Sequence, residues 1–297
     1  MSRSPERPIR VAAAVLWQMR FDLLAVVVVA LVMAAASTVV SFSAAAALVP
    51  LLGVVVSIFI GFRNSNAFNR WWEARTLWGT LVGNCRAISN AFVAVDDGSE
   101  AMAEVLDRMR RRQVRHAWQL AAELRGTQVP TGVRELTPED PADATAGSLL
   151  TLQSADIRDL AQADHIDRQG RSILVNLNSA QANTAGGLQR VRHQPIPLYY
   201  AGFVRLLAWL FGILVCTRVD ASGHHSAQGI IIGILVMALF VVAERMGHLA
   251  EGSLGNSPFA LPMDGFCATI TADLLGSDHP LAAPAATARP AGRSPGR

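Results

Sequence analysis

The sequence offers few residues arranged for enzymatic chemistry. It contains no HExxH, GxGxxG or P-loop pattern, and its closest approach to a GxSxG nucleophile elbow has Glu251 where the first glycine is needed. His224 and His225 are adjacent, so on a helix their side chains would point about 100° apart and could not share a metal ion. No CxxC pair occurs among the three cysteines, Cys85, Cys216 and Cys267. We therefore expect no enzyme activity, no metal site and no cofactor.

Two stripes of side chains run side by side along residues 53–65 at i, i+4 spacing. The first stripe is small and consists of Gly53, Ser57, Gly61 and Ser65; the second is bulky and apolar and consists of Val54, Ile58 and Phe62. Small residues let neighbouring membrane helices approach closely. A bulky apolar stripe beside them that faced a lumen would form a hydrophobic constriction that gates by dewetting. The residues alone favour a simpler interpretation, in which the apolar stripe faces lipid or a neighbouring helix.

The helix that carries these stripes belongs to a long uncharged run. Residues 23–62 contain no charged side chain, and a bilayer-spanning helix needs about 20 residues, so the run holds two passes with a break near Ser41, Ser43 and Pro50. It is far longer than the apolar core of a signal peptide, so we expect no cleavage. Two more apolar passes are predicted at 196–217 and 227–243.

The composition predicts a membrane part joined to a soluble part. With 51% hydrophobic and 16% charged residues, the chain is too apolar for an ordinary soluble domain and too charged for membrane helices alone. The formal charge of +3 is mild and every basic residue is arginine, so we expect no nucleic-acid partner. Arginines flank the outside of the first hairpin, and by the positive-inside rule both termini are then cytoplasmic.

The fold class predicted from these patterns is an all-α membrane protein with four transmembrane helices per subunit. Its segments are a cytoplasmic N-terminal segment 1–20, transmembrane helices 21–62, a helical cytoplasmic domain 63–195, transmembrane helices 196–243, a cytoplasmic C-terminal helical segment 244–275 and a disordered tail 276–297. The helical spacing continues from Phe62 into the cytoplasmic domain without a turn signal, so one helix leaves the bilayer and carries on.

Within the cytoplasmic domain, one helix is predicted to end at Gly126, and two later helices are predicted to break near Gly170. The basic run 107–116 is interpreted as the solvated face of its helix. The tryptophans at the start of the domain, Trp71, Trp72 and Trp78, are interpreted as interfacial anchors and as core. We expect Glu73 and Arg75 to form structural ion pairs.

Three stretches resemble the bestrophin family in its bacterial branch. They are GFRNSNAFNRWWEARTLWG at 61–79, PIPLYY at 195–200 and LPMDGFCATITADL at 261–274, set in the order of two membrane helices, a helical insert and two more membrane helices. The resemblance covers residues 10–273. It implies a homopentameric ion channel in the cell inner membrane, surrounded by lipid, with one central pore lined by the second membrane helix of each subunit.

The resemblance reverses the interpretation of the apolar stripe, because Val54, Ile58 and Phe62 match the neck positions of the family. Asn66 and Asn69 would then line the pore beyond the neck. A second, cytoplasmic constriction is also implied. Ile173 in RSILVNLN is its candidate, with a register open by about one to three residues; the alternative is a core isoleucine.

The permeant ion stays open at this point. The eukaryotic members are calcium-activated chloride channels, which implies small monovalent anions, but the neck residues carry no charge and a sodium-conducting channel is an alternative. Where those members clasp calcium, this chain offers only Glu251 and Asp264 as carboxylates. Calcium takes six to eight oxygen ligands. We therefore predict no calcium clasp.

A secondary transporter and a non-conducting membrane scaffold are the remaining alternatives. A transporter would place ionisable residues near mid-membrane and show repeats. Arg205 is the only ionisable residue within the predicted spans and lies near a cytoplasmic end, and no inverted repeat is visible. A scaffold would not require the paired stripes.

Overall fold

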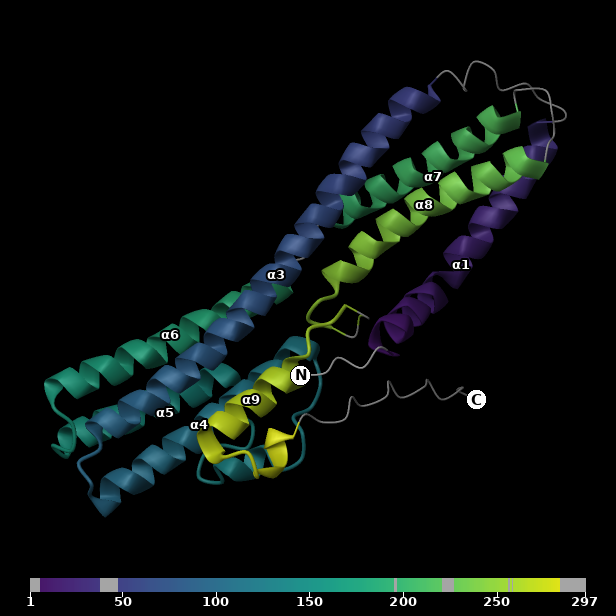
Figure 1. Ribbon diagram of the computed structural model, residues 1–297. Coiled ribbons are helices and arrows are strands. Elements are labelled where there is room, and N and C mark those ends of the chain that lie inside the picture. Colours follow the sequence, from purple (N-terminus) through teal and green to yellow (C-terminus); the bar gives the residue numbers. More distant parts are fainter. Residues whose placement is uncertain are drawn as a thin grey trace. The chain divides into compact units, whose positions relative to one another are not determined.

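The computed structural model describes residues 6–37, 48–194, 197–220, 227–255, 257 and 259–283. Within these residues the regular structure is helical, with no strand. The α-helices are α1 (Glu6–Ser37), α3 (Val49–Val95), α4 (Glu100–Arg125), α5 (Ala146–Gln162), α6 (Arg168–His193), α7 (Leu198–Asp220), α8 (Ala227–Glu251) and α9 (Met263–Leu275) (Figure 1). Two short 3-10 turns, Arg134–Leu136 and Pro280–Ala282, complete the described part.

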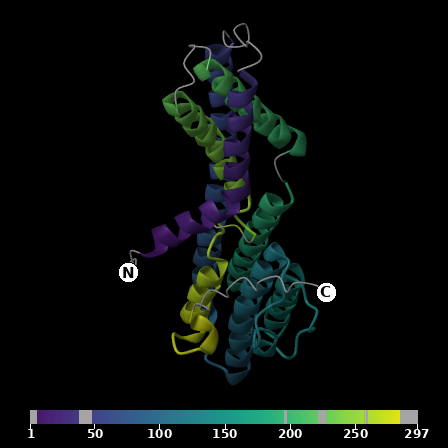
Figure 2. The same cartoon turned by 90° about the vertical axis from the view of Figure 1, so that its right-hand side faces the viewer.

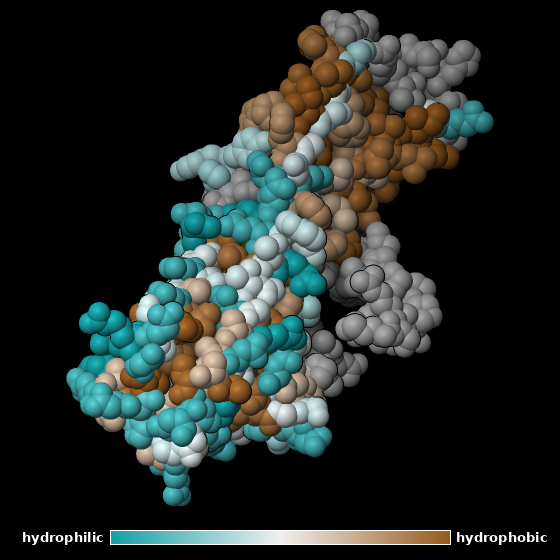
Figure 3. Space-filling model, turned by 60° about the vertical axis from the view of Figure 1, so that its left-hand side comes forward, coloured by the Kyte–Doolittle hydropathy of each residue, from teal (hydrophilic) through white to brown (hydrophobic). Residues whose placement is uncertain are grey.

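The chain divides into two compact units. The first comprises Met1–Trp72 and Pro195–Ala260, and the second comprises Glu73–Gln194 and Leu261–Arg297. The first unit therefore reaches about ten residues further along α3 than the predicted membrane boundary at 62. Hydrophobic side chains dominate the surface of the first unit and hydrophilic ones that of the second on the face shown in Figure 3.

Within the described residues, four helices are long and apolar enough to cross a membrane: Trp17–Ala36, Val49–Val95, Tyr199–Cys216 and Gln228–Glu251. They fall where the sequence predicts its four passes. The predicted connector at 41–50 lies mostly outside the described residues, as do His224 and His225 in the connector between α7 and α8.

The first unit is held together by apolar side chains between these helices. α7 packs along α8, and α1 packs against both (Figures 1 and 2). α3 joins them through a cluster made with α7: Val49, Val56, Ile60, Val204, Ala208, Phe211 and Val215. The approach of α7 to α8 needs a glycine, since a Cβ on Gly212 would clash with Met237.

α3 runs for 47 residues without a break, as the uninterrupted helical spacing predicts. Pro50 lies in its first turn, where a proline needs no intrahelical donor. No other proline interrupts the helix before Val95. The stripes at 53–65 and the Trp pair Trp71 and Trp72 therefore stand on one rigid element.

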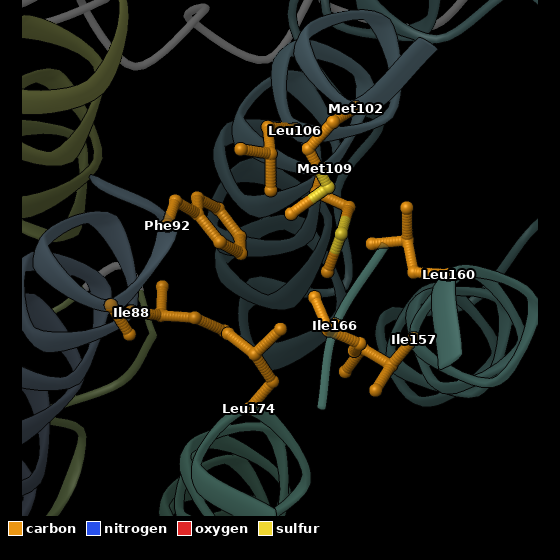
Figure 4. Packing of buried hydrophobic residues seen from close by; sticks show 10 residues of the cluster. Ile88, Phe92, Met102, Leu106, Met109, Ile157, Leu160, Ile166 and Leu174 are labelled. Atoms are coloured by element: carbon orange, nitrogen blue, oxygen red, sulfur yellow. The ribbon is translucent and has the colours of Figure 1, made fainter. Parts of the chain in front are cut away.

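The second unit is a helical bundle with an apolar core. Local caps set both ends of α4. The Ser99 side chain accepts from the backbone N–H of Met102 at the start, and Gly126 adopts a left-handed φ of 69° at the end, where the sequence predicts that the helix stops. The core joins α3, α4, α5 and α6 through Ile88, Phe92, Met102, Leu106, Met109, Ile157, Leu160, Ile166 and Leu174 (Figure 4).

The predicted break near Gly170 is wrong by several residues. α5 ends at Gln162 and α6 begins at Arg168, so Gly170 lies inside the first turn of α6. The Asp167 side chain caps α6 by accepting from the backbone N–H of Gly170 at 2.6 Å. Asp164 takes a left-handed φ of 57°, which turns the chain between the two helices.

The basic run 107–116 is not a solvated helix face throughout. Arg112, Arg115 and His116 are buried. The loop that follows α4 folds back over this side of the helix: Asp140 binds Arg112, and the Thr137 carbonyl accepts from Arg115 Nη1 at 2.9 Å. The loop supplies the acceptors that let arginines be buried.

The predicted tail also begins too early. Residues 276–283 are described and include the turn Pro280–Ala282, which packs against α9. Its first residue, Pro280, follows His279, whose Nδ1 accepts from the backbone N–H of Leu281 at 3.2 Å. Residues 284–297 lie outside the described part of the chain.

Candidate functional site

The three predicted neck side chains lie on the outer face of α3. Val54, Ile58 and Phe62 are 60%, 51% and 64% exposed within the chain. Residues of the opposite face are buried: Val56 and Ile60 are core residues packed toward α7. Among the described residues nothing covers the apolar stripe, and half to two thirds of each of these large side chains is accessible.

The polar candidates continue along the same helix. Asn66 and Asn69 are both exposed. At about 100° per residue, Asn69 lies within about 20° of Ile58 around the axis, whereas Asn66 lies about 80° away. Asn69 therefore continues the face of the neck stripe, and Asn66 stands at its flank.

The small stripe divides into two parts with different surroundings. A Cβ on Gly53 would lie 3.0 Å from Cε2 of Phe211, so this glycine lets α7 approach α3 within the chain. A Cβ on Gly61 would meet nothing within 4 Å among the described residues. Ser57, Gly61 and Ser65 are exposed, and Ser57 Oγ donates to the Gly53 carbonyl at 2.7 Å. No described segment of the chain packs into the space that Gly61 leaves open.

Ile173 stands on the outside of α6. It is 41% exposed, whereas its neighbour Leu174 is fully buried in the core of the second unit. The alternative that Ile173 is a core isoleucine is therefore wrong. Val175 is also exposed on α6, so two apolar side chains flank the core residue on the free side of this helix.

The three tryptophans of the α3 motif differ in their environment. Trp78 is fully buried and stacks on Phe266 with ring centroids 5.7 Å apart. Trp71 Nε1 donates to the Phe259 carbonyl at 3.0 Å, while Trp72 is 57% exposed. Of the two charged residues beside them, Glu73 forms the predicted ion pair, with Arg190 at 2.7 Å. Arg75 instead lies over the ring of Phe266.

The comparisons with known proteins agree with this architecture. The family model described as Bacterial/Fungal Bestrophin protein matches residues 4–276. The chain belongs to the bacterial and fungal bestrophin family. The resemblance noted in the sequence is thereby confirmed, and membership of this family also confirms the prediction that the chain is not an enzyme. With its four apolar spans it is a membrane protein.

Its relatives within the bestrophin family include proteins named as voltage-dependent anion channel-forming proteins. The one from Synechocystis sp. is 25% identical over 77% of this chain and 75% of its own length, and YneE of Escherichia coli is 26% identical over 76% and 74%. Crystal structures of a bacterial bestrophin homologue from Klebsiella pneumoniae superpose with a TM-score of 0.78 at 23% identity, covering 88% of this chain and all of that one. They establish the fold.

Two charge clusters of this bestrophin, one buried and one partly exposed, were not foreseen from its sequence. In one, Arg63 forms ion pairs with Glu244 and with Glu251, the latter at 3.1 Å. Arg63 is only 1% exposed. The sequence feature that could have indicated this cluster is an arginine directly after the neck, together with two glutamates seven residues apart, which share one face of a helix.

The second cluster joins α1, α7 and α8. Asp22 receives Arg205 Nη2 at 2.8 Å and Arg245 Nε at 2.9 Å. Arg205, the only ionisable residue of the predicted spans, is thus tied to an acid at the end of another span. This pairing does not resemble a mid-membrane transport site.

The carboxylates left for a calcium clasp are engaged elsewhere. Glu251 binds Arg63, and Asp264 binds Arg125. Among the described residues, no group of three or more acidic, histidine or cysteine side chains could hold a metal ion. The absence of a calcium clasp stays a prediction, since Asn256 and Pro258 of this stretch lie outside the described residues.

The second unit contains titratable groups shifted by burial and pairing. Burial alone would raise the pKa of Asp140, but the hydrogen bonds and charge of Arg112 outweigh burial and lower it. Burial lowers the pKa of His116, whose Nδ1 lies 2.9 Å from the Ala146 carbonyl. His116 is therefore a neutral imidazole that donates from Nδ1, which suits a structural rather than a proton-transfer role.

Proposed function

We propose that the chain is one subunit of a homopentameric anion channel whose central pore is lined by α3. Val54, Ile58 and Phe62 form its hydrophobic neck, and Asn69 and Asn66 follow along the path. The observation that carries the proposal is the contrast between the two faces of α3, one packed into the chain and the other left open over the length of the neck stripe. Dewetting of such a neck would gate the flow of ions.

The composition of the open face supports a pore and subunit contacts over contact with lipid. The outer face of α8 presents large aliphatic side chains, as lipid contact requires: Ile231, Ile232, Leu235 and Leu239. The outer face of α3 instead mixes its apolar stripe with Ser57, Gly61 and Ser65. Small residues of this kind support close helix contacts between subunits, beside the stripe that faces the lumen.

Anion conduction follows from the relatives and is compatible with the residues. Several relatives are named as anion channel-forming proteins. The neck carries no charge, Arg63 is buried and paired, and the electropositive edge of the Phe62 ring and the amide N–H groups of Asn69 can face an anion. We propose chloride as the permeant ion and Ile173 as the side chain of a second constriction.

We also propose a membrane and an orientation for the channel. The channel would lie in the cell inner membrane, with both termini and the second unit in the cytoplasm and with lipid against the outer faces of α1, α7 and α8. Arginines on the flanks of the first hairpin support this orientation.

Reconstitution of the full chain into planar bilayers tests the function. Unitary currents whose reversal potential in asymmetric NaCl follows chloride would support it. A reversal potential that follows sodium would replace it by a cation channel, slow coupled flux by a transporter, and silence by a scaffold. Native mass spectrometry in detergent should show five subunits, and a stable monomer or dimer would refute the assembly.

A further inference from the structure

The stretch of α3 directly after the neck is fastened to α8 by buried polar groups. Arg63 follows Phe62 in sequence and points about 100° away from it around the helix. Its Nη1 pairs with Glu244 and its Nε donates to Glu251 at 3.1 Å. Asn64 Nδ2 donates to the Ala243 carbonyl at 3.1 Å. Two consecutive residues of α3 are thus bound to one face of α8.

The partner face on α8 is shaped for this contact. Glu244, Gly247 and Glu251 stand at i, i+3 and i+7, so they lie on one side of the helix. A Cβ on Gly247 would clash with Oδ1 of Asn64, and Cγ of Arg63 lies 3.8 Å from that position. Gly247 therefore leaves the space into which α3 fits, and the two glutamates hold Arg63 on either side of it.

A third fastening lies two turns further along α3. The chain after α8 folds back on the end of that helix, where Ser257 Oγ donates to the Leu249 carbonyl at 2.6 Å. The Phe259 carbonyl of this segment accepts from Trp71 Nε1 at 3.0 Å. α8 and its following segment thus hold α3 at residues 63–64 and again at 71, on the side away from the neck stripe.

We propose that Arg63 is a positioning residue of the gate: its clamp on Glu244 and Glu251 sets the rotation of α3 and so holds the Phe62 ring in the neck. The inference rests on the proposed channel function. A dewetted constriction conducts least when every side chain of its ring is held inward. Loosening the clamp lets α3 turn and tilt, which widens the ring and favours the wetted, conducting state.

The buried charges suit a positioning role better than a purely stabilising one. A buried ion pair is often no more stabilising than apolar side chains of the same volume, whereas its geometry is specific. Here one guanidinium pairs with two carboxylates two turns apart on α8, which restricts both the rotation and the sliding of α3. An apolar contact at residue 63 would tolerate sliding and rotation.

The test is single-channel recording of the full chain in planar bilayers with three clamp variants. Arg63→Gln removes both ion pairs, Glu244→Gln removes one, and Gly247→Ala keeps every charge but pushes α8 away from Asn64. Each should raise the ratio of open to closed time by about fivefold or more, the lower end of usual couplings between a site and a conformational equilibrium. Gly247→Ala keeps the test valid if Arg63→Gln does not fold.

Two controls separate positioning from a general loss of stability. Val241→Ala weakens the packing of the same helix in the cluster it forms with α1 and α7, away from α3. Arg86→Gln breaks an exposed ion pair with Asp273 on the distal part of α3. Thermal unfolding of each variant is recorded beside the currents.

The recordings distinguish the channel function, the positioning role of Arg63 and a purely structural role of Arg63. A silent wild-type chain would overturn the channel function itself. Wild-type currents with an unchanged open ratio in Arg63→Gln and Gly247→Ala would overturn the clamp and leave the channel standing. An equal change of the open ratio in Val241→Ala would show that Arg63 contributes only to stability, which would overturn the positioning role. A change confined to the three clamp variants would support the positioning role.

Discussion

Replacing Asp140 by asparagine should loosen the loop between α4 and α5 from the second unit. Asp140 accepts two hydrogen bonds from Arg112, from Nε at 2.7 Å and from Nη2 at 2.6 Å. Both side chains are almost fully buried, at 3% and 4% exposure. Asparagine keeps the volume but removes the charge and one acceptor, so the guanidinium loses its bidentate partner inside the protein.

The size of the effect follows from what Arg112 retains. Removing one partner of a buried ion pair costs about 3–5 kcal/mol because the other charge is left uncompensated. In Asp140→Asn, Asp156 still pairs with Arg112 and compensates part of its charge. We therefore expect the variant to lose about 2–4 kcal/mol of stability. The matched exposed pair Arg86–Asp273, broken by Asp273→Asn, should cost less than about 1 kcal/mol.

Limited trypsin digestion and thermal unfolding measure this difference. Arg134 lies in the affected loop, in the 3-10 turn Arg134–Leu136. Cleavage after Arg134 should accelerate in Asp140→Asn and stay at the wild-type rate in Asp273→Asn, with the unfolding temperature falling only in the first variant. Equal cleavage rates and unfolding temperatures for both variants would refute the argument that Asp140 makes the burial of Arg112 possible.

Four further predictions concern the gate, the calcium response, the response to pH and the packing of the spans. Ile58→Ala and Phe62→Ala should raise unitary conductance by widening the neck, whereas Leu239→Ala on the outer face of α8 should not; the reverse pattern would place the lumen on another helix. Ile60 on the opposite face of α3 is not a suitable control, because it is a core residue and its truncation would destabilise the first unit. Open probability should be the same in micromolar calcium and in chelator, and a rise with calcium would reveal a site among other residues. The second unit should lose stability as the pH falls below about 6.5, the ordinary pKa of histidine, because the unfolded chain then protonates His116 while the folded chain, in which its pKa is lowered, does not. His116→Gln should flatten that dependence in thermal unfolding at pH 5 to 7, and an unchanged slope would contradict the assignment. Gly212→Ala should force α7 from α8 at Met237 and cost about 1–3 kcal/mol of stability, the usual range for overpacking, which thermal unfolding would register as a lower unfolding temperature. Gly202→Ala, where a Cβ meets nothing within 4 Å, should leave the unfolding temperature unchanged.

Features that depend on local patterns could be predicted from the order of the residues alone. Apolar runs long enough for a bilayer located the four spans, and the unbroken helical spacing through residues 61–79 determined that α3 continues past the first unit. The same period of 3.6 residues placed Val54, Ile58 and Phe62 on one face, because the side-chain directions of a continuous helix follow from residue spacing alone. The family motif added the expectation of a pore, which periodicity does not contain.

Which polar side chains are buried and which apolar ones are exposed depends on contacts between segments far apart in the chain. Arg63 pairs with Glu244, which is 181 residues away in the chain, and Arg112 pairs with Asp140, which is 28 residues away. A local sequence pattern therefore does not show that these arginines are buried. Ile173 and Leu174 are chemically alike neighbours, yet one is exposed and the other fills the core, since the helix packs along only one of their two directions. Whether a side chain is buried depends on which other segments pack against it, and these contacts exist only in the folded chain.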